Sequence, residues 1–459
     1  MINYFNILNE IKKSDCLTLL LYFSLLNNYS VLSQVTVDKP INTCTSHKSA
    51  SRLLNRPNTV SDNQKMIDIS YYKLEIDINL VEQQIHGSVL VEGNIISEEP
   101  DIIELDLSEN LTVDSVLYLD NLWDFIHLND KIQIIVPNNL NDDKYFSFEI
   151  IYHGRPISTG FGSFNFSKYR GIDHIWTLSE PYGSRDWWPC KDDPSDKADS
   201  VDIIITIPSD QIAVSNGLLV DQIDLENDRK KFHWAERYPI STYLVSITTY
   251  PYREWTDEYI GVNGDTLPLY YYVYPDHYDM VYDNYATTKD MLYLFENKFG
   301  EYPFINEKYG HVEFIRGGGM EHQTISSLGG HSQWLIAHEL AHQWWGNLVT
   351  CESFHHIWLN EGFARFSEAL WQESIGGNKA YKEYWIAHAY YGSGTIFVEE
   401  PTSAYEIFNG NLTYNKAGWV VHMLRGVLGD SIFYETLKSY GSNDSLSYNS
   451  ASTSDFQKV

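Results

Sequence analysis

Cysteine is scarce in this chain of 459 residues, and its four cysteines lie far apart, at positions 16, 44, 190 and 351. A disulfide framework or a cysteine-ligated zinc site would need cysteines in close, regular spacing, so the sequence supports neither. We expect Cys190 and Cys351 to be buried thiols, because a free cysteine behaves as a small apolar side chain.

Basic residues are also few. Lysine and arginine total 32 against 62 aspartates and glutamates, which gives a formal net charge of −30 with histidine neutral. Nucleic acids and anionic membranes attract proteins through basic surfaces, so this balance excludes both as expected partners. With 43% apolar and 15% aromatic residues the chain should fold into a globular protein, with its surplus acids on a solvated surface.

Long apolar runs are missing, and we expect no integral membrane segment. The longest run near the N-terminus, residues 16–26 (CLTLLLYFSLL), is about half of the roughly 20 residues that a membrane helix needs. Lys12 and Lys13 precede it, and Val31, Leu32 and Ser33 follow it. This order favours a signal peptide over residues 1–33 and a secreted or periplasmic protein; a buried helix is the alternative. Residues 34–67 are polar and are expected to form a leader.

The periodicity of apolar residues changes along the rest of the chain. Short alternating runs at 74–80, 103–107, 131–136, 145–152, 201–207 and 243–248 predict an antiparallel β-rich domain over residues 68–255. Longer helical patterns follow, at 277–299, from Ser332 to Gly346, and from Asn360 as N-cap to Gly376 and Gly377. The fold class predicted is α+β and multidomain, with a second, mainly helical domain over residues 256–459.

The second predicted helix carries the sequence His338-Glu339-Leu340-Ala341-His342. Residues four apart share one helix face, so both imidazoles can bind one metal ion with Glu339 beside it. Two imidazoles and one carboxylate are typical of a catalytic zinc site, which keeps a position for water. Eighteen residues separate His342 from Glu361, which lies near the start of the next helix and is the candidate third ligand.

Four motifs in this order resemble the gluzincin zinc aminopeptidases, the family of aminopeptidase N and leukotriene hydrolase. They are the zinc motif with Asn360-Glu361-Gly362, Gly318-Gly319-Met320-Glu321-His322, Tyr414-Asn415-Lys416, and Trp188-Pro189-Cys190 with Asp193 and Lys197. The resemblance covers roughly residues 68–459. It implies a thermolysin-like catalytic domain in a secreted, bacterial-like member with one Zn²⁺ per chain, and peptides with a free N-terminus as substrates.

The chemistry of the residues agrees with the resemblance. Zinc held by His338, His342 and Glu361 would activate a water molecule and polarise the scissile carbonyl. Glu339 is placed to take the proton from that water and deliver it to the leaving amine. The resemblance implies that Tyr414 donates a hydrogen bond to the oxyanion of the tetrahedral intermediate.

The resemblance also implies which residues bind the substrate. Glu321 would capture its free ammonium group, and Glu180 would make a second contact with that amine. The glycines before Glu321, among them Gly318 and Gly319, would let a peptide backbone approach closely, with Met320 beside it; an ordinary glycine-rich turn is the alternative.

Glu368 lies two helical turns after Glu361 on the same face. It either hydrogen-bonds a ligand histidine and fixes its tautomer, or is a solvated glutamate.

Two features depart from the family pattern. His322 stands where the family has an asparagine, and the chain ends at Val459, before the further helical region that the family normally has. We expect a C-terminally truncated zinc aminopeptidase. Epoxide hydrolysis or endopeptidase action on the same zinc site, and a non-catalytic scaffold, are the alternative functions.

Overall fold

The computed structural model describes residues 60–97, 100–136, 144–401 and 403–459. The predicted signal peptide and most of the predicted leader lie outside the described residues. No helix in these ranges is both long and apolar enough to cross a membrane.

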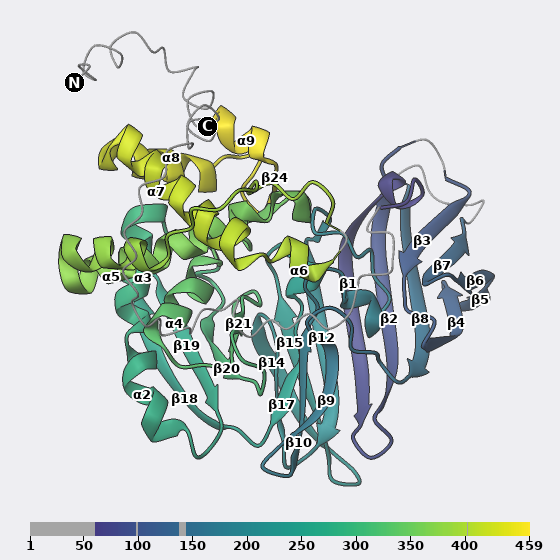
Figure 1. The fold of residues 1–459 in the computed structure, drawn as a ribbon. Helices are drawn as coiled ribbons and strands as arrows, with labels where there is room; N and C mark the ends of the chain where they lie inside the picture. Colours follow the sequence, from purple (N-terminus) through teal and green to yellow (C-terminus); the bar gives the residue numbers. More distant parts are fainter. Residues whose placement is uncertain (1–59, 98–99, 137–143, 402) are drawn as a thin grey trace, which may run out of the picture. The chain divides into compact units, whose positions relative to one another are not determined.

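The first half of the described chain is built on an eight-stranded sheet. Figure 1 shows four of its strands, β1, β2, β8 and β4, side by side in purple and blue. In sheet order the strands are β14 (Leu218–Leu225), β15 (Arg229–Glu236), β12 (Ser200–Pro208), β1 (Ile67–Asn79), β2 (Gln84–Ile95), β8 (Tyr145–Gly154), β4 (Leu111–Tyr118) and β5 (Asn121–Trp123). Most neighbours are antiparallel, as predicted, but β1 and β12 pair in parallel.

Smaller sheets complete this half. The first contains β13 (Ile212–Val214), β17 (Thr248–Tyr250), β10 (Ile172–Leu178) and β9 (Ser163–Tyr169); the second contains β3 (Ile102–Asp106), β7 (Lys131–Ile135) and β6 (Phe125–Leu128); the third pairs β11 (Lys197–Ala198) with β16 (Ile240–Ser241). The prediction of a strand at 243–248 is wrong. The chain forms a 3-10 turn at Thr242–Leu244, and pairing begins only at Thr248.

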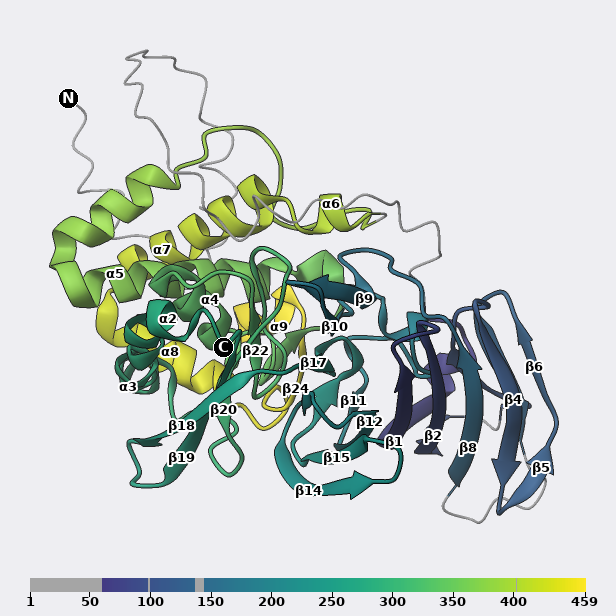
Figure 2. The ribbon, with the colours of Figure 1, turned by 90° about the horizontal axis from the view of Figure 1, so that it is seen from below.

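A five-stranded sheet begins at Arg253 and introduces the helical half. Its order is β18 (Arg253–Ile260), β19 (Thr266–Val273), β20 (Tyr309–Glu313), β22 (Ser326–Leu328) and β21 (Gly319–Met320). The helices of this half are α2 (Tyr278–Ala286), α3 (Thr288–Phe299), α4 (Gln333–Ala341), α5 (Trp358–Ala387), α6 (Ala404–Ile407), α7 (Ala417–Leu428), α8 (Asp430–Gly441) and α9 (Thr453–Lys458). Figure 2 shows α7 running along α5, in green.

The predicted helices exist, with different boundaries. The segment 277–299 forms two helices that meet at Thr287, whose hydroxyl donates to the Asn284 carbonyl (2.6 Å) and competes with the backbone hydrogen bonds. The second helix ends at Ala341 rather than Gly346. The third begins at Trp358, so Asn360 is not its N-cap; the predicted break at Gly377 is confirmed by its left-handed backbone (φ +65°).

Buried apolar side chains of the described residues form two clusters. One fills the first half of the chain, and the other lies among the helices. Met320, Cys351 and Tyr414 come from the second half yet pack in the first cluster, whereas Leu340 and Ala341 of α4 pack in the second. The segments that carry the predicted site therefore lie where the two cores meet.

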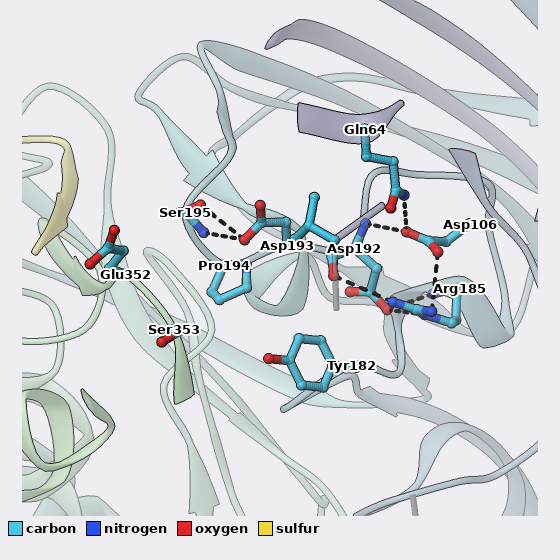
Figure 3. Close-up of a pocket in the computed structure, with 11 residues that line it drawn as sticks. Gln64, Asp106, Tyr182, Arg185, Asp192, Asp193, Pro194, Ser195, Glu352 and Ser353 are labelled. Atoms are coloured by element: carbon cyan, nitrogen blue, oxygen red, sulfur yellow. Dashed lines mark hydrogen bonds and ion pairs between the residues drawn. The ribbon is translucent and has the colours of Figure 1, made fainter. Parts of the chain in front are cut away.

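The Pro-Cys motif of the first half lines a cavity of about 320 Å³. Figure 3 shows Arg185 between Asp106 and Asp192, with Glu352 and Ser353 of the later, green part of the chain across the cavity. Arg185 Nη1 lies 3.1 Å from Asp106 Oδ1, and its Nε lies 2.9 Å from Asp192 Oδ2. Burial raises the pKa of Asp192 to about 6 even with the guanidinium beside it.

Replacing Arg185 by methionine should destabilise the protein by about 3–5 kcal/mol at pH 7, because it leaves the buried carboxylate of Asp192 without its cation and Asp106 with Lys131 alone. Without Arg185 the folded-state pKa of Asp192, which burial already raises, rises further. The deficit in the free energy of unfolding should therefore shrink as the pH falls through that raised pKa and Asp192 becomes protonated. Urea unfolding at pH 7 and pH 5 measures this. The control is Lys65→Met, which removes an exposed ion pair with Asp62; equal effects of the two substitutions would contradict the prediction.

Candidate active site

Two histidines and a glutamate converge in the interior of the helical half. Glu361 Oε2 lies 3.1 Å from His338 Nε2 and 3.4 Å from His342 Nε2, and all three side chains are buried. The potential ligand atoms of the three residues lie within 4.8 Å of one another. Neutral imidazoles and a carboxylate are the donors that zinc and related divalent ions bind, so this group fits one metal ion.

Local sequence explains how these ligands meet. Ser332 caps α4 by accepting a hydrogen bond from the Leu335 amide (3.3 Å), which fixes the start of the helix. His338 lies in the last turn of α4, and His342 lies one turn further on, at its C-cap. Glu361 lies in the first turn of α5, which packs against α4.

The second nitrogen of each histidine is held from outside the cluster. His338 Nδ1 donates to Glu368 Oε1 (2.8 Å), and His342 Nδ1 donates to the Trp345 carbonyl (3.0 Å). These contacts leave both Nε2 atoms facing Glu361 and fix the tautomer that a metal ligand needs. Glu368 is therefore buried beside the cluster. Of the two alternatives that the sequence left open, that of a solvated glutamate is wrong.

Glu368 in turn has partners of its own. Arg365 Nη1 lies 3.0 Å from its Oε1, and the Tyr384 hydroxyl donates to its Oε2 (2.9 Å). Burial alone would raise the pKa of Glu368, but Arg365 and His338 lower it, so the carboxyl group is ionised. The sequence analysis missed Arg365 and Tyr384. Arg365 could have been found, because it follows Glu361 by four residues on the same helix face.

Glu339 is buried next to the edge of the five-stranded sheet. A Cβ atom at Gly319 would overlap the Glu339 carboxylate, so only glycine allows β21 to pass this close to it. Gly318, with a left-handed backbone (φ +88°), begins this approach, and Met320 packs in the first core. Gly319 thus makes room for the Glu339 side chain, a reason that the sequence did not suggest.

Glu321 is also buried, and its carboxylate, that of Glu339 and the imidazole of His342 have ligand atoms within 4.8 Å of one another. Its Oε1 has no hydrogen-bond partner among the described residues. Asn347 holds the Glu321 backbone by donating to its carbonyl (2.8 Å), and Lys197 donates to the Asn347 carbonyl (2.6 Å). The Pro-Cys motif of the first half therefore supports Glu321 through Lys197.

His322, which follows Glu321, is fully buried. Its Nδ1 contacts the Ser327 hydroxyl (2.9 Å), and burial lowers its pKa to about 3. The residue is therefore a neutral part of the framework that holds β21.

Tyr414 lies on a π-helical turn, Gly410–Lys416, that leads into α7. Its hydroxyl donates to Glu361 Oε1, and its ring stacks on His338 with centroids 6.1 Å apart. Single π-helical turns are frequent at functional sites because they re-aim one side chain. The turn brings Tyr414 to the cluster across 53 residues of sequence, which spacing alone could not show.

Glu180 is buried and belongs to the first half of the chain, two residues after the end of β10. Burial raises the pKa of both Tyr243 and Cys351, and the nearby charges of Glu180, Glu321 and Glu361 raise it further. Carboxylates from three separate segments therefore lie close enough to raise the pKa of the same tyrosine and the same thiol. Cys190 and Cys351 are buried free thiols, as predicted.

The site has an excess of negative charge that a cation would balance. Burial lowers the pKa of His342, but the carboxylates of Glu321, Glu361 and Glu339 outweigh it and raise the pKa to about 10. Buried carboxylates are costly unless a positive charge is close to them. A divalent metal ion at the histidines and an ammonium group at Glu321 would supply that charge.

Comparisons with known proteins agree with this site. The Peptidase M1 N-terminal domain family matches residues 69–244, and the Peptidase family M1 domain matches residues 284–459. The chain is 27% identical to human endoplasmic reticulum aminopeptidase 2 over 345 residues, 68% of this chain and 35% of that protein. It is also 27% identical to aminopeptidase A of Gloydius brevicauda over 342 residues, 66% and 33% of the two chains. The chain thus spans about a third of the length of these curated relatives.

Solved structures show the same fold. A variant of the M1 zinc metallopeptidase from Deinococcus radiodurans superimposes with a TM-score of 0.76 and 26% identity, covering 86% of this chain and 90% of that one. A variant of a two-domain M1 zinc metallopeptidase bound to L-tryptophan gives a TM-score of 0.77 and 25% identity, with the same coverage.

Replacing Glu368 by alanine should weaken metal binding about 10–100-fold, because His338 loses the partner that orients it. The measurement is a competition titration of the metal-free protein with Zn²⁺ and a chromophoric chelator. Glu373→Ala is the matched control, since Glu373 lies on the same helix but pairs with Arg425. Equal zinc affinity in the two variants would contradict the prediction.

Proposed function

Because the chain belongs to the peptidase M1 family, we propose that it is a zinc-dependent aminopeptidase that removes the N-terminal residue of peptides. One observation carries the exopeptidase assignment: the buried carboxylate of Glu321 lies beside the metal cluster, with an oxygen that no described residue hydrogen-bonds. A negative charge in that position would bind the free ammonium group of a substrate, one residue away from the scissile bond.

The residues that would hold zinc are His338, His342 and Glu361, whose donor atoms fit its preferences. Bound there, zinc supplies Lewis acidity, which polarises the substrate carbonyl and makes water a stronger nucleophile near neutral pH. Glu368 and the Trp345 carbonyl keep the two imidazoles in the tautomer that binds metal.

Two side chains would handle protons and developing charge. Glu339, beside His342, takes a proton from the attacking water and passes it to the leaving amine. Tyr414 releases its hydrogen bond with Glu361 and donates to the developing oxyanion. A donor of this kind typically lowers the barrier by about 3–4 kcal/mol.

The substrate amine would be held between Glu321 and Glu180, with β21 beside them. Both carboxylates are buried, and the charges that raise the Tyr243 pKa include both of them. Gly319 and Met320 form β21, with Gly318 before it and Glu321 directly after it, so the peptide would extend along β21. The alternatives of epoxide hydrolysis, endopeptidase action and a scaffold are not favoured, because the matching relatives are named as aminopeptidases.

The test uses aminoacyl anilides with free and with N-acetylated amines. Wild-type protein should hydrolyse the free-amine substrates, lose activity with a zinc chelator, and leave the acetylated ones intact. Glu321→Ala should lower kcat/KM for free amines about 10–100-fold, because a hydrogen bond to a charged group is worth ~1.5–3 kcal/mol. Glu352→Ala, an exposed acid in the cavity of Figure 3, is the control. Hydrolysis of acetylated substrates at the same rate would overturn the exopeptidase assignment.

We also propose that residues 1–33 direct the chain out of the cytoplasm and are removed. The support is the order of Lys12 and Lys13, the apolar run 16–26, and the small residue Ser33. When the whole chain is expressed in a secreting host, the exported protein should have the mass of a chain that begins at Gln34. Leu20→Arg, which interrupts the apolar run, should keep the protein inside the cell; export of an uncleaved chain would contradict the proposal.

A further inference from the structure

A second group of two histidines and one glutamate lies outside the proposed catalytic cluster. His277 precedes α2, Glu313 is the last residue of β20, and His331 lies just before α4. Glu313 Oε1 is 2.9 Å from His277 Nδ1 and 3.1 Å from His331 Nε2. None of these residues belongs to the four motifs that the sequence analysis singled out.

The geometry of this group matches that of the catalytic cluster. Both groups contain two imidazole nitrogens and one carboxylate oxygen, all within 4.8 Å of one another. The nitrogen to oxygen distances of 2.9 and 3.1 Å compare with 3.1 and 3.4 Å at Glu361. A first-row metal ion binds these atoms at about 2.0–2.2 Å, which places two of its ligands roughly 3–3.5 Å apart.

Neighbouring groups hold two of the three candidate ligands, Glu313 and His277, in place. Glu313 Oε2 accepts a hydrogen bond from the Tyr274 amide (2.5 Å), so Oε1 is the oxygen turned toward the histidines. His277 Nε2 lies 3.0 Å from the Tyr169 hydroxyl and 3.8 Å from Asp276 Oδ2. Metal-binding histidines usually have such an oxygen partner on their second nitrogen.

The group is accessible to an ion from solution. The Glu313 side chain is 1% exposed, whereas the His277 and His331 side chains are 25% and 21% exposed. The carboxylate therefore lies at the bottom of the group, and the two imidazoles lie between it and the surface. Water could complete the coordination from the exposed side.

We propose that His277, Glu313 and His331 bind a second divalent transition-metal ion of the zinc class, with a structural role. Glu313 and His331 are the two ends of the segment that contains β21, Glu321 and β22, and His331 leads into the helix of His338. An ion bound here closes this loop and ties it to the segment before α2. Through Tyr169 of β9 it also connects the loop to the first half of the chain.

The experiment measures zinc per chain in the full-length protein, by elemental analysis after equilibration with Zn²⁺ and removal of free ion. Wild type should hold two equivalents. His338→Ala combined with His342→Ala should leave one equivalent, and adding His331→Gln to this pair should leave none. Wild type with a single equivalent would overturn the proposal and would mean that the three side chains form hydrogen bonds only.

Separate variants on three segments guard against misfolding. His277→Gln, Glu313→Gln and His331→Gln should each lose one equivalent while keeping the wild-type circular dichroism spectrum. His356→Gln, a partly buried histidine that contacts Thr453, is the matched control and should keep two. Two equivalents in all three single variants would overturn the proposal. Because the stoichiometry is measured without substrate, failure here is distinguishable from failure of the aminopeptidase assignment.

Discussion

Concentrated negative charge in the protein interior is the constraint on which this molecule depends. Five glutamates near the cluster, Glu180, Glu321, Glu339, Glu361 and Glu368, are each at most 4% exposed. Isolated carboxylates at such depth would be neutralised by protons or would unfold the chain. Arg365 balances Glu368, and the remaining charge suits a metal ion and a substrate ammonium group. The same buried negative charge that is costly to the fold thus favours the binding of cations.

The site lies between two cores, and residues from both halves of the chain hold its side chains in place. Tyr414 and Met320 pack with the core of the first half, although they lie in the second. Lys197 crosses in the opposite direction and holds Asn347, which in turn holds Glu321. A side chain at such a junction is fixed by packing on two sides, which limits its movement.

Local patterns in the sequence predicted the parts of the site that depend on helix geometry. His338 and His342 lie one turn apart with Glu339 between them, so spacing was sufficient for these three residues. Glu368 follows Glu361 on one helix face, but spacing left open whether it contacts a histidine or is solvated. The helix boundaries were less predictable. Asn360 resembles an N-cap, but it lies inside α5, and its side chain accepts a hydrogen bond from the Cys351 amide (3.2 Å). The group of His277, Glu313 and His331 joins three segments far apart in sequence, and only the tertiary fold brings them together.

The short strands β23 (Val349–Cys351) and β24 (Asn449–Ala451) pair in parallel across about a hundred residues of chain. β23 begins seven residues after His342, and its partner strand β24 emerges about a hundred residues after it when the chain is synthesised. Long-range parallel contacts form slowly, and chains fold from the N-terminus as they leave the ribosome. The eight-stranded sheet can therefore form before β24 has been made, whereas the loop that follows His342 gains the support of β24 only after about a hundred further residues have been synthesised.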